Sequence, residues 1–197
     1  TILPRLASFF DTTIDDLIGY TPQLSKEQIQ KLFIEFTVAF AEKPFEEVLA
    51  ATRREVKRYY SCYPYLFQIC VLWLNHFVLS ANADIQTDIL HDILKLSNHI
   101  LTNCKDVGIC SDTISMQSLV HLQLGRPQDV IGTLGELSNP YRPKNQNYLL
   151  LTQAYIMTGP TDQAERLMQI SMYYYALSFV ASCGLYLTIC PADAAPC

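Results

Sequence analysis

The side chains that most often bind metals or act as nucleophiles are dispersed along this chain. None of the seven cysteines belongs to a Cys-x-x-Cys pair, and no histidine pair has the His-Glu-x-x-His spacing of zinc sites. The histidines lie on separate segments, as His76, His91, His99 and His121. The cysteines are Cys62, Cys70, Cys104, Cys110, Cys183, Cys190 and Cys197. We therefore expect no metal site, and interpret the histidines as hydrogen-bonded or solvent-facing side chains.

Carboxylates and glycines also lack a catalytic arrangement. Two acidic pairs, at 15–16 and 46–47, stand near expected helix starts, where a carboxylate stabilises the helix through its dipole. Gly132 and Gly135 fall inside a helical pattern and do not form a phosphate-binding loop, and the chain contains no Gly-x-Ser-x-Gly sequence. We expect no catalytic residue, no bound cofactor and no enzymatic activity.

The one basic cluster of the chain offers a different kind of chemistry. It consists of Arg53, Arg54, Lys57 and Arg58, with Glu55 among them. On a helix, residues four apart share a face, so Arg53 lies beside Lys57 and Arg54 beside Arg58. Two interpretations stay open: a solvated helix face, or a face that contacts a partner or a phosphate backbone.

Composition restricts the class of protein. Half of the 197 residues are hydrophobic and 17% are charged, against about 25% in an average soluble domain. This excludes intrinsic disorder, and a net charge of −5 gives no general attraction for nucleic acids. With so many apolar residues available for a core, the cysteines are typical of buried thiols in a reducing compartment. We expect a cytoplasmic protein.

Two spans without charged residues raise the question of a membrane. They run from Arg58 to Asp84 and from Arg166 to Asp193, and both exceed the ~20 residues that a bilayer-crossing helix needs. Both contain polar residues, and we expect Cys183-Gly184 to interrupt the second. Helices buried inside a soluble stack explain both spans, so we expect no membrane association. The alternative, a membrane-associated helical protein, would be insoluble without detergent.

The elements that carry these residues follow a helical period. Apolar residues recur three and four positions apart over 25–40, 44–59, 64–79 and 85–104. Ser25 and Gln28 have the spacing of a capping box at the first of these helices. No segment alternates with a period of two, and no Asn-Gly or Asp-Gly hairpin turn occurs. The sequence therefore predicts an all-α protein.

An internal repeat is visible in the second half of the chain. Gly125 and Gly159 are 34 residues apart, and each ends one helical pattern and begins a turn into another. This is the period of the tetratricopeptide repeat. The unit around Gly159 resembles that repeat at its packing positions, which are Tyr148, Leu151, Thr152, Tyr155, Ala164, Met168 and Ser171. The resemblance implies a right-handed α-α superhelix of helical hairpins over residues 25–190, and an irregular helical bundle is the alternative.

The same resemblance implies a peptide groove on the concave face, which the first helix of each repeat lines. Amides there bind a peptide backbone, while aliphatic residues accept its side chains. Transferring the repeat pattern to this chain gives a candidate groove of Ser115, Leu119, Leu122, Gln123, Gln146, Leu149, Gln153 and Ile156. The alternative is a surface that is only solvated or that forms a dimer.

The N-terminal residues 1–20 resemble the last two helices of an Xre-type (lambda-repressor-like) helix-turn-helix domain. The resemblance rests on Leu6-Ala7-x-x-Phe10-x-x-Thr13-Ile14-Asp15-Asp16-Leu17-Ile18-Gly19, in which Thr13 is the expected N-cap. It implies that 1–20 is the remnant of a DNA-binding domain whose recognition helix would precede Thr1. DNA would then be bound only through that upstream part.

Together these resemblances lead to two functional hypotheses. In the first, the chain is the regulatory part of a bacterial Xre-family transcriptional regulator that dimerises two DNA-binding domains and binds a peptide or small-molecule effector. This architecture is similar to the peptide-pheromone-responsive regulators of Gram-positive bacteria. In the second, the chain is a helical-repeat scaffold that binds a protein or peptide and has no role at DNA. A homodimer is expected under the first.

Overall fold

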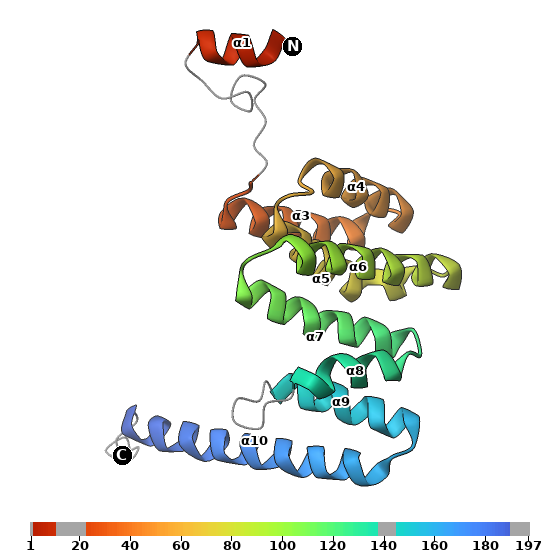
Figure 1. The fold of residues 1–197 in the computed structure, drawn as a ribbon, viewed down its shortest axis with the longest axis vertical. Helices are drawn as coiled ribbons and strands as arrows, with labels where there is room; N and C mark the ends of the chain where they lie inside the picture. The colour runs from red at the N-terminus through yellow and green to blue at the C-terminus, as the bar shows by residue number, and fades with distance from the viewer. Residues whose placement is uncertain (1, 11–22, 138–144, 190–197) are drawn as a thin grey trace, which may run out of the picture. The chain divides into compact units, whose positions relative to one another are not determined.

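The computed structural model describes residues 2–10, 23–137 and 145–189 (Figure 1). Within these ranges the regular structure is helical and contains no strand. The prediction of an all-α protein is confirmed. The contacts among the residues divide the chain into two compact units, which meet in sequence between Thr113 and Ile114.

The helices of the first unit follow one another with short connections. They are α1 (Ile2–Phe9), α3 (Lys26–Glu42), α4 (Phe45–Arg58), α5 (Tyr63–His76) with a 3₁₀ turn (Phe77–Leu79), α6 (Ala83–Asn103) and the first part of α7 (Val107–Gln123). Helix α1 contains the apolar residues expected of a short N-terminal helix. The rest of the predicted helix-turn-helix remnant, residues 11–20, lies outside the described residues.

Local signals in the sequence set where these helices begin. The expected capping box is confirmed: the Ser25 side chain accepts a hydrogen bond from the Gln28 N–H at 3.2 Å, and the Gln28 side chain accepts one from the Ser25 N–H at 2.8 Å. Pro44 precedes α4, whose first turn holds two glutamates, as the dipole argument predicted. At α6, the Asn82 side chain accepts a hydrogen bond from the Asp84 N–H at 2.8 Å.

Helix α5 is the central helix of the first unit and contacts α3, α4 and α6. Its buried residues are Tyr65, Leu66, Ile69, Cys70, Leu72 and Trp73. The Trp73 indole N–H donates to Thr52 Oγ1 at 2.9 Å, which joins α5 to α4 inside the core. The first charge-free span is therefore a buried helix, as predicted.

The second unit is built from the end of α7 with α8 (Pro127–Leu137), α9 (Asn145–Thr158) and α10 (Thr161–Ile189). Helix α9 contacts both α8 and α10. The core of this unit draws on α7, α8 and α9, through Leu122, Val130, Leu134, Leu150, Leu151 and Ala154. The Ala164 side chain on α10 is also buried, which agrees with its expected place at a close helix approach.

The two glycines of the repeat adopt left-handed backbone conformations. Gly125 has φ 68° and follows α7, and Gly159 has φ 106° and follows α9. The Arg126 N–H donates back to the His121 carbonyl at 2.8 Å, which closes the end of α7 around Gly125. Because L-residues rarely adopt positive φ, these turns favour glycine on backbone grounds alone.

Alanine substitutions at glycines should therefore change stability with opposite signs. A Cβ at Gly125 or Gly159 meets no atom within 4 Å, so the cost of alanine there is backbone strain, about 1–2 kcal/mol of unfolding free energy. Gly132 lies inside α8 with equally open space, and Gly132→Ala should raise the unfolding free energy by about 0.5–1 kcal/mol. Urea denaturation measures both, and a stabilising Gly125→Ala would contradict the turn.

Helix α10 differs from the expectation in two ways. It continues through Cys183 and Gly184, because one glycine inside a helix costs only about 1 kcal/mol and a 29-residue helix tolerates it. It is also not buried toward its end, where large apolar side chains are exposed: Met172, Tyr173, Tyr175, Leu177, Phe179, Val180, Leu185, Tyr186, Leu187 and Ile189. Among the described residues, α10 alone is long and apolar enough to cross a membrane, and none of its most apolar stretch is buried.

Candidate functional site

The predicted basic cluster lies on α4, but its four side chains do not act as one face. Arg53 points to α6, where its Nη2 lies 2.6 Å from Asp92 Oδ2. Arg58 lies on another side, with Nη1 3.9 Å from Glu55 Oε1 and its guanidinium over the Tyr59 ring at 5.2 Å. The cluster is thus divided between an interhelical ion pair and a solvated side of α4.

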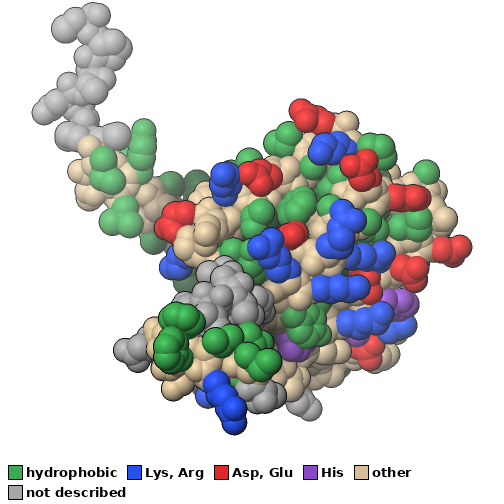
Figure 2. All heavy atoms as spheres, turned by 90° about the horizontal axis from the view of Figure 1, so that it is seen from above, with side chains coloured by type: hydrophobic (Ala, Val, Ile, Leu, Met, Phe, Trp, Pro, Cys, Tyr) green, Lys and Arg blue, Asp and Glu red, His purple; other side chains and the backbone are tan. Residues whose placement is uncertain are grey.

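A cavity of about 310 Å³ opens beside the Arg53–Asp92 pair. Lys95 on α6 shares the same carboxylate, with Nζ 3.2 Å from Asp92 Oδ1. Figure 2 shows Lys and Arg side chains gathered with Asp and Glu on one face of the molecule. The cavity lining comes from α4, α5 and α6 and the turn after α4, as Arg53, Val56, Lys57, Tyr60, Trp73, Asp92, Lys95 and Leu96.

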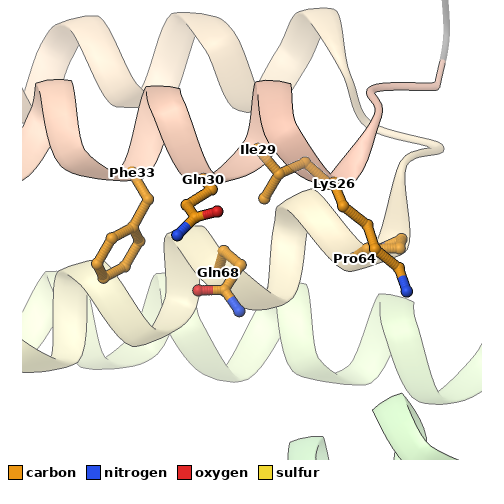
Figure 3. A pocket seen from close by; sticks show the side chains of 6 residues that line it. All are labelled: Lys26, Ile29, Gln30, Phe33, Pro64 and Gln68. Carbon is orange, nitrogen blue, oxygen red and sulfur yellow. The ribbon is translucent and has the colours of Figure 1, made fainter.

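A second cavity of about 310 Å³ lies between α3 and α5 (Figure 3). The amide side chains of Gln30 on α3 and Gln68 on α5 both line it, one from each helix. The rest of the lining is mainly apolar, with Lys26 at one end: Lys26, Ile29, Phe33 and Pro64. Sequence reasoning missed this site, because Gln30 and Gln68 lie on two different helices and no local pattern joins them.

Part of the predicted peptide groove is exposed on α9. Leu149, Gln153 and Ile156 are four and three residues apart, so they share one face of the helix, and all three are exposed. Ile156 exposes 63% of its surface. Gln146 belongs to the first turn of α9, and its side chain lies outside the described residues. This face is available to a ligand.

The α7 part of the predicted groove is mostly buried. Leu122 is 5% exposed and packs in the core of the second unit, against α8 and α9. Ser115 is 4% exposed, and its hydroxyl donates to Asn147 Oδ1 at 2.7 Å. Leu119 is partly buried against the same core, and Gln123 is exposed. Leu122 and Ser115 therefore cannot contact a ligand in this structure, because they hold α7 and α9 together.

Among the described residues, Cys62 and Cys70 are buried as expected, Cys104 and Cys110 are partly buried, and Cys183 is exposed because it lies on the uncovered part of α10. His76 Nδ1 lies 2.7 Å from the Leu72 carbonyl oxygen, and the His99 ring stacks on Tyr60 with 4.1 Å between ring centroids. Cys70 is fully buried, and burial raises the pKa of its thiol. In the described ranges no group of histidine, cysteine, aspartate or glutamate side chains is arranged to hold a metal ion.

The surroundings of His121 change its protonation. Its Nδ1 lies 3.3 Å from Asp129 Oδ2, without the alignment of a hydrogen bond. Burial lowers the pKa of His121 below its ordinary value of 6.5, the Asp129 carboxylate raises it, and the Arg126 charge lowers it. Since burial is the largest of these effects, the folded protein binds this proton more weakly than the unfolded chain does.

Acid should therefore destabilise the protein partly through His121. Its contribution to stability is complete above the unfolded pKa of about 6.5 and is lost as the pH falls through the lower, folded value. His121→Gln should reduce the loss of unfolding free energy between about pH 7 and pH 5, measured by urea denaturation. Asp129→Asn removes the charge that raises the pKa and should make the loss steeper. Equal pH profiles for all three proteins would contradict this role.

This chain was compared with known protein families, proteins and structures. No protein-family model, curated protein or solved structure matches this chain. The resemblances to the Xre family and to the tetratricopeptide repeat therefore stay predictions.

Proposed function

We propose that this chain is the regulatory part of a bacterial DNA-binding transcriptional regulator, which senses an effector in the cytoplasm and dimerises two DNA-binding domains. DNA would be bound by a helix-turn-helix that precedes Thr1. The resemblance of residues 1–20 to the end of an Xre-type domain implies this recognition element. The observation that supports the sensing role most directly is the amide-lined apolar cavity between α3 and α5.

The proposed architecture is a right-handed superhelix of tetratricopeptide-like hairpins. Features within single helix pairs support this architecture. Helix pairs α3–α4 and α5–α6 are joined by short connections, and α7–α8 and α9–α10 are joined by left-handed glycines 34 residues apart. The buried small residues Ala154 and Ala164 agree with close packing between α9 and α10.

In such an architecture α3 and α5 are the first helices of successive hairpins, which are the helices that line a concave groove. The cavity between them has the chemistry of a peptide site. Gln30 and Gln68 can donate to and accept from a peptide backbone, and Ile29, Phe33 and Pro64 can contact an apolar side chain. The exposed face of α9 offers the same combination of an amide with aliphatic side chains.

The dimerising role is supported by α10, for which we propose a second copy of this chain as the partner. Each aromatic side chain buries about 150–250 Å² when it is covered, and a stable interface buries about 800 Å² per partner. Tyr173, Tyr175, Phe179 and Tyr186 are each at least 46% exposed, and six aliphatic or methionine side chains accompany them. A second copy of the chain packed along one side of α10 would cover a large part of this apolar surface.

A helical-repeat scaffold with no DNA role is the second candidate. The exposed Leu149, Gln153 and Ile156 of α9 favour it, since a peptide-binding face serves a scaffold as well as a sensor. What precedes Thr1 separates the two candidates. Codons for a helix-turn-helix immediately upstream in the source gene support the regulator, whereas a stop codon or an unrelated domain refutes the DNA role and leaves the scaffold.

Sedimentation equilibrium over a range of protein concentrations tests the dimer in detergent-free buffer. A concentration-dependent monomer–dimer equilibrium that Phe179→Glu weakens supports the proposed interface, because Phe179 is 70% exposed on α10. A monomer at all concentrations refutes it. A protein that stays in solution only with detergent or lipid vesicles also refutes it, and indicates that α10 enters a membrane.

A further inference from the structure

The cavity between α4 and α6 has a cationic rim. Asp92 receives two cations, Arg53 at 2.6 Å and Lys95 at 3.2 Å, so its single charge is shared between them. Lys57 adds a third cation to the lining and forms no ion pair among the described residues. Three positive charges and one negative charge therefore face the same space, and two positive charges lack a counter-charge in the lining.

Arg53 also retains an unused hydrogen-bond donor. Its Nε is buried and has no hydrogen-bond partner within the described part of the chain, although its Nη2 is paired with Asp92. A buried donor without a partner destabilises the folded protein, and more so when it is charged. An anion bound at the rim would remove part of this destabilisation, directly or through water.

The floor of the same cavity is apolar and aromatic. Val56, Trp73 and Leu96 are at most 6% exposed and line it from three helices. Tyr60 is 46% exposed, and its stacking on His99 holds the ring in position. A volume of about 310 Å³ is near the lower end of the range for pockets that hold small molecules.

We propose that this cavity binds a small amphipathic carboxylate. Lys57, Lys95 and Arg53 bind its carboxylate, and its aromatic or aliphatic part lies against Tyr60 and Trp73. The site is separate from the α3–α5 cavity and from α9. The proposal therefore applies whether the chain is part of a regulator or a scaffold. Its test requires neither DNA nor a dimer, so its failure is distinguishable from failure of the proposed function.

The single tryptophan of the chain makes the test specific, since Trp73 lines this cavity. We expect 4-iodobenzoate to quench the Trp73 emission with saturation, because its iodine is brought against the ring. The neutral analogue 4-iodobenzamide has the same ring and iodine without the charge, and it should give only the linear quenching of collisions in solution. Added salt should weaken the saturable binding.

Two lysine variants and one matched arginine variant complete the test. Lys57→Gln and Lys95→Gln should each raise the dissociation constant of 4-iodobenzoate by about tenfold, since a charge-assisted hydrogen bond contributes at least that ratio. Arg54→Gln removes the same charge from the exposed neighbouring position, which does not line the cavity, and should change it by less than about twofold. Circular dichroism confirms folding of the variants, whose replaced side chains are exposed.

Three results would overturn the proposal. One is linear quenching by 4-iodobenzoate in the unmodified protein. Another is saturable quenching by the amide with equal affinity, which would indicate an apolar site without anion selectivity. The third is an equal loss of affinity in Arg54→Gln and Lys57→Gln, which would indicate attraction by the general charge of α4 and not by this cavity.

Discussion

Leu134→Ala lowers the free energy of unfolding by about 2–5 kcal/mol, which is the expected result for a fully buried leucine. Leu134 is 1% exposed on α8 and packs in the core formed with α9. Truncation removes apolar surface from that core and leaves a cavity that the surrounding helices fill only in part. The loss is measured by urea denaturation, followed by far-ultraviolet circular dichroism.

Leu149→Ala is the matched control, because it makes the same truncation on α9 where the side chain is 41% exposed. We expect it to change the free energy of unfolding by less than about 0.5 kcal/mol. A loss of similar size in both variants would mean that α8 and α9 do not pack as described. The control also informs the candidate groove, since a folded Leu149→Ala protein can be tested for weaker peptide binding.

Thr52→Val is expected to cost about 1–3 kcal/mol of unfolding free energy, although it preserves the shape of the side chain. Thr52 is fully buried, and its hydroxyl accepts the Trp73 indole N–H at 2.9 Å while donating to the Leu49 carbonyl at 2.9 Å. Valine removes the acceptor and leaves the indole N–H buried without a partner. The measurement is urea denaturation, with Trp73 emission as a local probe.

Thr87→Val is the control for the loss of a threonine hydroxyl from a helix. Thr87 is exposed on α6, and its hydroxyl donates to the Ala83 carbonyl at 3.0 Å. Water replaces that hydrogen bond, so the expected change is within about 0.5 kcal/mol. If Thr52→Val is as mild as Thr87→Val, the buried hydrogen bond between α4 and α5 does not stabilise the first unit.

Sequence reasoning predicted the helices and their ends because the signals are local. The Ser25 capping box formed as predicted, with both hydrogen bonds present, and Gly125 and Gly159 adopt the left-handed turns that end α7 and α9. The burial of α5 was also predictable, since a charge-free apolar segment with a few polar groups suits the centre of a helical stack. These features depend on residues within a few positions of one another.

The two cavities and the groove could not be predicted in the same way, because they depend on contacts between residues that are far apart in the sequence. Asp92 pairs with Arg53 from 39 residues away, and Gln30 and Gln68 line one cavity from two different helices. The predicted groove was confirmed only in part for the same reason: Ile156 is exposed, whereas Leu122, its equivalent 34 residues earlier, is part of the core. A helical period identifies an apolar face, but the neighbouring helices decide which part of that face is covered.

The sequence by itself therefore determined the helical character of the chain, the helix start at Ser25 and the glycine turns, because hydrogen bonds and backbone strain within one turn set them. Only the tertiary structure decided that α5 is covered on several sides while the apolar end of α10 is exposed, although the two segments are similar in composition. It also created the two cavities, because their walls come from separate helices that packing of the first unit brings together.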